Sequence, residues 1–192
     1  MWTRLRAELN DAGLTPDTHP VVNFKQARQL PYLKAVVREE MQYFPGIVLG
    51  LKRATSLPVD SACRPRTVIT VSEGVMLAFN LYIINRNREL WGPDSHDFRP
   101  ERWLHGDRES EQALAQRLQV MNDSDLTFGA GSRVFLGKSL ALMQTYKVFA
   151  TLVLCYDVEL VHPEREWKVI NSWFPRSKGL EVRLTRRGAS TV

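Results

Sequence analysis

The chain has 192 residues, of which 44% are hydrophobic and 24% charged, the composition of a globular protein and not of a disordered or fibrous one. The length suits one domain with its own core. The net charge of +5 is small and the basic residues are dispersed, which argues against nucleic-acid binding. The charged N-terminus is no signal peptide, and the longest apolar run is shorter than the ~20 residues of a spanning helix. We therefore expect no membrane anchor in this chain.

Cysteines and histidines form no metal-binding pattern. Cys63 and Cys155 are far apart in the sequence, and the histidines are scattered (His19, His96, His105 and His162). Because zinc sites draw their ligands from close, regular spacings, we expect no metal site. Two unclustered thiols also fit a reducing compartment, so a cytoplasmic location is expected.

The first 46 residues have the periodicity of three helices. The first begins at Trp2 and stops at Gly13. Asn23 can cap a second, short helix, and Pro31 suits the first turn of a third, because its missing N–H costs nothing there. The third helix ends at Pro45. It carries an apolar stripe of Leu33, Val36, Val37, Met41 and Phe44.

The middle of the chain predicts strands and then irregular structure. Residues 67–71 and 75–79 are β-branched or aromatic runs around a Ser72-Glu73-Gly74 turn, which predicts a hairpin. Residues 91–103 are dense in turn formers and large aromatics, a composition typical of a packed loop. Residues 106–125 are polar and are predicted to be a surface excursion.

A glycine loop and a long helix follow. The loop from Phe128 to Gly137 contains Gly-x-Gly and an arginine, Arg133, which can serve equally in a structural turn or a ligand loop. A core stripe is predicted in the helix after it (Leu140, Met143, Tyr146, Lys147, Ala150 and Leu154). Residues 158–161 and 180–184 alternate as strands of a C-terminal hairpin. The predicted fold class is α+β, mainly helical, with small β-hairpins.

Four stretches in this order resemble the C-terminal part of a fungal cytochrome P-450, a haem-thiolate monooxygenase. Residues 30–39 resemble the family's Glu-x-x-Arg helix, and residues 74–91 resemble the hairpin and short helix that follow it. Residues 98–103 match the Pro-Glu-Arg segment, and residues 128–137 match the haem loop Phe-x-x-Gly-x-Arg-x-Cys-x-Gly. The resemblance implies one incomplete P-450-like domain over residues 1–192, with the oxygen-handling half and the membrane anchor of the family expected before Met1.

The resemblance also implies haem as the cofactor and assigns its contacts. Arg133 and Arg53 lie at positions that contact haem propionates in the family. The axial cysteine is replaced by Phe135, whose benzyl group has no donor atom for iron, and a thiolate there favours O–O cleavage. Cys155 is 20 residues further on, about 30 Å along one helix. The haem-loop and propionate positions are Phe128, Gly131, Arg133, Phe135, Gly137 and Arg53, and no catalytic or metal-binding residue is assigned.

A buried ionic cluster is a second implication of the resemblance. In the family it joins the glutamate and arginine of Glu-x-x-Arg to the arginine of the Pro-Glu-Arg segment. The corresponding residues here are Glu39, Gln42 and Arg102. Glu39 and Arg102 can still pair, whereas Gln42 offers only neutral donors. Since charge-assisted hydrogen bonds are roughly twice as strong as neutral ones, we expect a weaker cluster.

Three functions follow from these observations. The first is a degenerate relative of fungal specialised-metabolism enzymes that lacks monooxygenase activity of its own. The second is a component of a fungal secondary-metabolite pathway that still catalyses an oxidative or a non-redox step. The third is a partner-binding module, because the apolar faces of residues 33–44 and 140–154 would attract another protein if exposed.

Overall fold

The computed structural model describes residues 1–46, 52–54, 59–63, 67–72, 74–131, 134–170 and 175–188. For the strands between residues 52 and 71, and for Leu77, only the backbone is described. The side chains of Arg53 and Cys63 and the whole of Arg133 therefore lie outside the described residues, as does Glu73 of the predicted turn.

Helices dominate the described chain. In order they are α1 (Trp2–Asp11), α2 (Phe24–Gln29), α3 (Pro31–Tyr43), α4 (Leu81–Ile84), α5 (Arg88–Trp91), the 3-10 helix η1 (Pro100–Trp103), α6 (Glu111–Ser124) and α7 (Lys138–Cys155). The strands are β1 (Lys52–Ala54), β2 (Val59–Cys63), β3 (Thr67–Val71), β4 (Met76–Ala78), β5 (Tyr156–Leu160), β6 (Lys168–Ile170), β7 (Arg176–Lys178) and β8 (Val182–Arg186). They form two-stranded antiparallel pairs, β1–β4, β2–β3, β5–β8 and β6–β7. The predicted class, mainly helical α+β, is confirmed.

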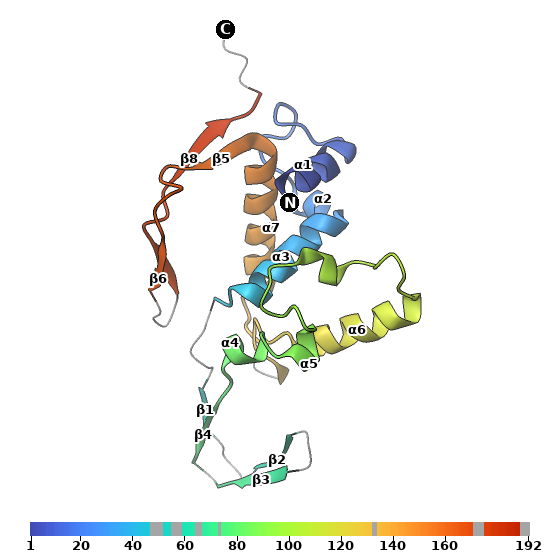
Figure 1. Cartoon of the computed structure of the whole chain (residues 1–192), viewed down its shortest axis with the longest axis vertical. Coiled ribbons are helices and arrows are strands. Elements are labelled where there is room, and N and C mark those ends of the chain that lie inside the picture. The colour runs from blue at the N-terminus through green and yellow to red at the C-terminus, as the bar shows by residue number, and fades with distance from the viewer. Residues whose placement is uncertain are drawn as a thin grey trace.

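The main core lies among α1, α2, α3 and α7, which are grouped together in Figure 1. Each helix buries one apolar face against the others, as their sequence periodicity predicts. The central residues are Leu5, Leu9, Ala27, Leu33, Val36, Val37, Ala150, Val153 and Leu154. A smaller cluster joins Ala35 of α3 to Trp91, Trp103 and Met121. This second cluster fixes the segment between α5 and α6 against α3.

Local capping explains where the first three helices begin and end. Gly13, at φ 75°, follows the end of α1 and adopts the left-handed conformation that favours glycine. The side chain of Asn23 accepts a hydrogen bond from the backbone N–H of Lys25 and so caps α2. Pro31 is the first residue of α3. These three predictions are confirmed.

A carboxylate from another helix caps α3. The residue before α3 is Leu30, which has no side-chain acceptor. Glu8 of α1 supplies one instead: its Oε1 accepts from the Tyr32 N–H at 2.6 Å and its Oε2 accepts from the Leu33 N–H at 2.8 Å. Because these N–H groups have no partner inside the helix, Glu8 satisfies both and places negative charge at the positive end of α3.

We expect Glu8→Ala to lower the free energy of unfolding by about 1–2 kcal/mol, the range for loss of a helix cap. The measurement is urea unfolding followed by circular dichroism. Asp11→Ala is the matched control, since it removes a nearby exposed carboxylate of α1 that caps no helix. Equal midpoints for the two variants would contradict the role of Glu8.

The strand pairing differs from the predicted hairpin. Residues 67–71 pair with 59–63, not with 75–79, and β4 pairs with β1, in the register Lys52 with Ala78 and Ala54 with Met76. The sequence predicted that residues 75–79 pair with 67–71 because these are the nearest residues with strand-like composition. Strand β1 reads Lys-Arg-Ala and has no apolar alternation, so the sequence does not mark it as a competitor for β4. The predicted pairing of the C-terminal strands, β5 with β8, is confirmed.

The predicted surface excursion at residues 106–125 is also wrong in part, because most of it is helix α6. Ser110 caps this helix by accepting a hydrogen bond from the Ala113 N–H at 3.2 Å. Leu114, Leu118 and Met121 recur at helical spacing, and Met121 is buried in the smaller core cluster. That spacing was the available signal, although the many polar residues around it obscured it.

The strand pairs β1–β4 and β2–β3 form an arm that projects away from the helices in Figure 1. Its two ends meet at a neck formed by Gln42, Tyr43, Asn85 and Arg86. Asn85 Nδ2 donates to the main-chain oxygen of Gln42 at 2.7 Å, and Arg86 Nη2 donates to that of Tyr43 at 3.0 Å. The neck thus joins the end of α3 to the residues that follow α4.

The two predicted core stripes are only partly buried. Leu33, Val36 and Val37 of α3 are buried, but Phe44 is 48% exposed. Along α7, Tyr146, Ala150 and Leu154 are buried while Leu140 is 55% exposed. The stripes therefore supply both a core and an exposed apolar surface. Among the described helices, α7 included, none is both long and apolar enough to cross a membrane.

Candidate functional site

The loop before α7 is folded by its own backbone. Phe135 N–H donates to the Phe128 oxygen at 2.9 Å, which closes the loop across its width. Gly129 and Gly131 have φ values of 77° and 67°, so both occupy the left-handed region that disfavours residues with a Cβ. Lys138 N–H donates to the Phe135 oxygen at 3.1 Å as α7 begins. The two glycines are thus needed for this turn whether or not it holds a ligand.

Phe135 packs within the loop, although 58% of it is exposed. Its ring is parallel to that of Phe128, with an interplanar angle of 8° and centroids 6.4 Å apart, inside the range for stacked aromatic pairs. The ring also covers Gly137, where an added Cβ would lie 2.6 Å from Phe135 Cε1. Phe128, Phe135 and Gly137 therefore form one contact group, as their positions in the predicted haem loop suggested.

The residues of this loop do not fit a haem-thiolate centre. Such a centre requires a sulfur donor at residue 135, and the side chain there is a hydrocarbon ring. Cys155 is no substitute: it is 2% exposed at the opposite end of α7, with its Sγ 3.6 Å from the His19 oxygen. Among the described residues, no group of three or more histidines, cysteines or carboxylates could hold a metal ion. Arg53 and Arg133, the predicted propionate contacts, are not testable, since their side chains lie outside the described part.

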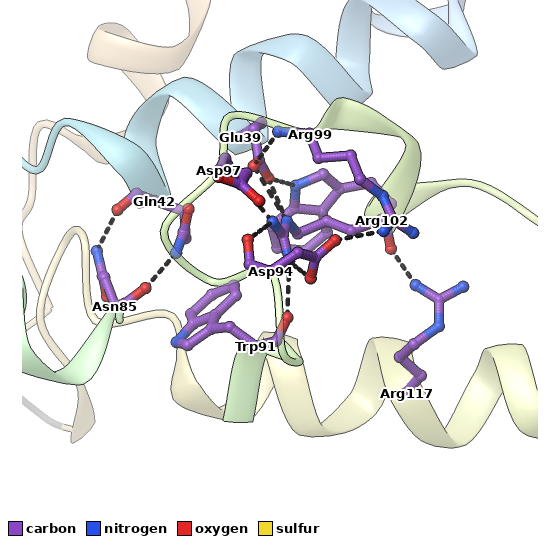
Figure 2. Close-up of polar contacts among 10 residues, drawn as sticks. Glu39, Gln42, Asn85, Trp91, Asp94, Asp97, Arg99, Arg102 and Arg117 are labelled. Carbon is purple, nitrogen blue, oxygen red and sulfur yellow. Dashed lines mark hydrogen bonds and ion pairs between the residues drawn. The ribbon is translucent and has the colours of Figure 1, made fainter. Parts of the chain in front are cut away.

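A buried ion pair between α3 and η1 is the second feature of the site (Figure 2). Glu39 and Arg102 are 0% and 3% exposed, and Arg102 Nε lies 3.0 Å from both Glu39 oxygens. Glu39 also accepts from the Arg99 N–H at 2.7 Å and from Trp103 Nε1 at 2.9 Å. The carboxylate is fully surrounded by donors, which is the condition under which a buried charge is tolerated.

Arg102 uses its other nitrogens to organise the chain between α5 and η1. Nη1 donates to the Trp91 oxygen at 2.6 Å and to Asp94 Oδ1 at 3.0 Å. Nη2 donates to the main-chain oxygens of Asp94 and Asp97, at 2.7 and 3.0 Å. A segment with no regular structure thus has its carbonyl groups satisfied by one guanidinium, whose planar fork offers five donors.

Burial and hydrogen bonding act in opposite directions on Glu39. Removal from water raises the pKa of the Glu39 carboxyl above its usual value, while the donors from Arg99, Arg102 and Trp103 oppose that rise. The cluster therefore depends on its hydrogen bonds to keep the carboxylate charged.

Gln42, the third residue of the predicted cluster, does not contact Glu39 or Arg102. Its Nε2 donates to the main-chain oxygen of Asn85, across the neck (Figure 2). Its Oε1 is buried and has no hydrogen-bond partner among the residues that the structure describes. The Gln42 amide therefore does not take the place of the arginine guanidinium that joins the ionic cluster in the family. It connects α3 to the neck residue Asn85 instead of to η1.

Arg117 of α6 extends the cluster, and sequence reasoning missed it. It donates to the main-chain oxygens of Arg102 and Leu104, and its Nη2 forms an ion pair with Glu109 at 2.6 Å. The hydrogen bond from Arg117 lowers the pKa of Glu109 to about 2. No sequence motif predicts this role of Arg117, because two of its partners are backbone oxygens whose positions are set only when η1 has folded.

Comparisons with known proteins agree with this geometry. The family model for cytochrome P-450 matches residues 3–180. The cytochrome P-450 monooxygenase cfoH of Aspergillus candidus is 45% identical over 100% of this chain and 35% of its own length. The cytochrome P-450 monooxygenase cicH of Emericella nidulans is 34% identical over 97% of this chain and 35% of its own length. A crystal structure of a cytochrome P-450 has a TM-score of 0.73 at 24% identity, over 97% of this chain and 38% of that one.

The chain thus spans about a third of the length of the curated relatives it matches. The matched range includes both the loop before α7 and the Glu39–Arg102 pair. Family match, relatives and fold lead to one conclusion: this chain belongs to the cytochrome P-450 family and corresponds to the C-terminal part of its fungal monooxygenases.

Proposed function

We propose that this member of the cytochrome P-450 family forms no haem-thiolate centre and has no monooxygenase activity of its own. The observation that carries the proposal is Phe135, whose ring stacks on Phe128 and covers Gly137 at the position where the family has its axial cysteine. Without a thiolate the iron loses both its anchor and the electron donation that favours O–O cleavage. The relatives are monooxygenases of fungi, and we place the protein in the cytoplasm of a fungus, beside specialised metabolism.

The test is a spectrum of purified protein with added haem, reduced and exposed to carbon monoxide. We expect no Soret band of the thiolate-ligated type. A band of that type in the unmodified protein would overturn the proposal. Metabolite profiling after gene deletion gives an independent readout, because an inactive protein predicts no missing oxidised product.

A second candidate function, binding of another protein, is favoured by an apolar groove between α3 and α7. The groove has a volume of about 600 Å³, and its lining includes Val36, Val37, Val148, Phe149 and Leu152. Val148, an apolar residue of α7, is 58% exposed. Exposed apolar patches of this kind usually mark an interaction surface or an aggregation site. Size-exclusion chromatography tests this candidate, since a stable monomer at all concentrations would contradict it.

A further inference from the structure

A pocket of about 500 Å³ lies between α2, α3 and the start of α7, and Phe128 is the one residue of its described lining that the family resemblance assigned to the haem loop. Four cations line it: Arg28 of α2, Lys34 and Arg38 of α3, and Lys138 of α7. Its described lining contains a single carboxylate, Asp125. The pocket therefore has a formal excess of three positive charges.

Two of these cations have no counter-charge. Within the described part of the chain, the side chains of Arg28 and Lys34 form no ion pair, and both residues are exposed. Lys138 Nζ lies 5.7 Å from the centroid of the Phe128 ring and forms no ion pair with a described carboxylate. The single carboxylate, Asp125, is already used: its Oδ1 accepts from the N–H and the hydroxyl of Thr127, at 3.1 and 2.6 Å. Asp125 thus offsets one of the four positive charges, and the described lining keeps an excess of three.

Arg38 is the anchored member of the four. Its guanidinium lies 3.7 Å from the centre of the Trp103 ring and donates to Asn122 Oδ1. Burial lowers the pKa of Arg38, and the charge of Asp125 opposes that shift. A guanidinium fixed on both sides in this way presents its remaining donors in a constant direction, which reduces the entropy that a bound anion must overcome.

The floor of the pocket is aromatic. Phe24 and Tyr146 meet edge to face, with ring centroids 5.9 Å apart, and Tyr146 is 6% exposed. Burial raises the pKa of Tyr146, and the charges of Arg38 and Arg28 oppose the rise. Met41 and Leu142 complete the apolar lining. A mostly apolar cavity with a few convergent polar groups is the usual form of a small-molecule site.

A second polar pocket, between α5 and α6, has a lining of charged residues that serves the fold. It is lined by five arginines and four carboxylates, and the ion pairs Arg102–Asp94, Arg99–Asp94 and Arg117–Glu109 lie within it. Its charges are nearly balanced, and three of its five arginines form ion pairs. The pocket beside α2 has neither property.

We propose that the pocket beside α2 binds a small organic anion whose flat ring lies on Phe24, with Tyr146 behind it, and whose phosphate or carboxylate group is held by Arg28, Lys34 and Arg38. Aryl phosphates and aryl carboxylates share this chemistry. The three cations that hold the anion lie outside the haem loop, so the site requires no haem and its test does not depend on the proposed loss of monooxygenase activity.

The test is isothermal titration calorimetry of the full chain with 2-naphthyl phosphate, 2-naphthoate, inorganic phosphate and 2-naphthol. We expect at least one of the two naphthyl anions to bind, and to bind more tightly than inorganic phosphate or the neutral naphthol. The double variant Arg28→Glu/Lys34→Glu is expected to lose about tenfold or more in affinity for that anion, equivalent to ~1.4 kcal/mol. Which naphthyl anion binds more tightly identifies the acidic group.

Arg165→Glu is the matched control, since it makes one comparable charge reversal at an exposed residue outside the pocket. It should leave the affinity within about twofold, and circular dichroism should show that all variants keep their helices. Binding of inorganic phosphate as tightly as the naphthyl anions, equal affinities in the double variant and the wild type, or no binding of either naphthyl anion to the wild type would each overturn the proposal.

Discussion

Arg102→Leu is expected to lower the free energy of unfolding by about 3–5 kcal/mol, the cost of removing one partner of a buried ion pair. The change leaves the Glu39 carboxylate, which is 0% exposed, without its cation. It also removes the donors to the main-chain oxygens of Trp91, Asp94 and Asp97. Since whole domains are stable by only about 5–15 kcal/mol, this loss removes a large share of the stability. Urea unfolding monitored by tryptophan fluorescence measures the loss.

Two further variants separate the charge from the packing. Arg88→Ala removes an exposed arginine that, like Arg102, lines the pocket between α5 and α6. It should change the free energy of unfolding by less than about 0.5 kcal/mol. The double variant Glu39→Leu/Arg102→Leu removes both charges and should be more stable than Arg102→Leu alone, because no buried carboxylate is left unpaired. The single variant Glu39→Leu completes the comparison. If the double variant loses as much free energy of unfolding as Glu39→Leu and Arg102→Leu together, the two charges are not coupled and the ion pair does not have the role given to it.

Phe135→Cys is expected to give the chain a thiolate-type Soret band with haem and carbon monoxide, where the unmodified protein has none. The backbone around the position is already formed, since Phe135 N–H donates to the Phe128 oxygen and Gly131 keeps its left-handed turn. Removing the ring also uncovers Gly137, which it now shields. A sulfur at residue 135 would supply the donor that the loop lacks.

Phe135→Ala is the matched control for this experiment. It removes the ring without adding sulfur, so it separates the effect of the ligand from the effect of a more open loop. A band of equal intensity in both variants would show that the iron takes its ligand from elsewhere. No band in Phe135→Cys would show that the loop alone, even with its sulfur, does not hold haem.

Sequence reasoning identified the features that depend on neighbours along the chain. Helical periodicity predicted α1, α3 and α7, and the caps at Asn23 and Pro31 follow from local chemistry. The family motifs predicted that Glu39 and Arg102 pair and that Phe135 occupies the position of the axial ligand. In each case the information lies within one or two turns of helix or in a short fixed pattern.

The features that were missed depend on residues far apart in the sequence. The Glu8 cap of α3 joins residues 24 and 25 positions apart, and the sequence shows only a solvent-facing glutamate on an amphipathic helix. The partner of β4 is β1 because the two are brought together across the neck, while the sequence favoured the nearer β3. Gln42 was expected to remain near Arg102, but its amide reaches the Asn85 oxygen first. Long-range partners of this kind are set by packing, which local propensity does not encode.

The neck also divides the molecule into separately replaceable parts. Gln42 and Tyr43 are joined to Asn85 and Arg86 over a separation of 43 residues, so the chain leaves the helical core and returns to it at the same point. Closing such an excursion costs entropy that grows only slowly with its length. Homologous arms of different length are therefore expected to be exchangeable at the neck, with α4 kept because its Leu81 is buried, which makes residues 44–80 a natural unit for building chimaeras between this chain and its relatives.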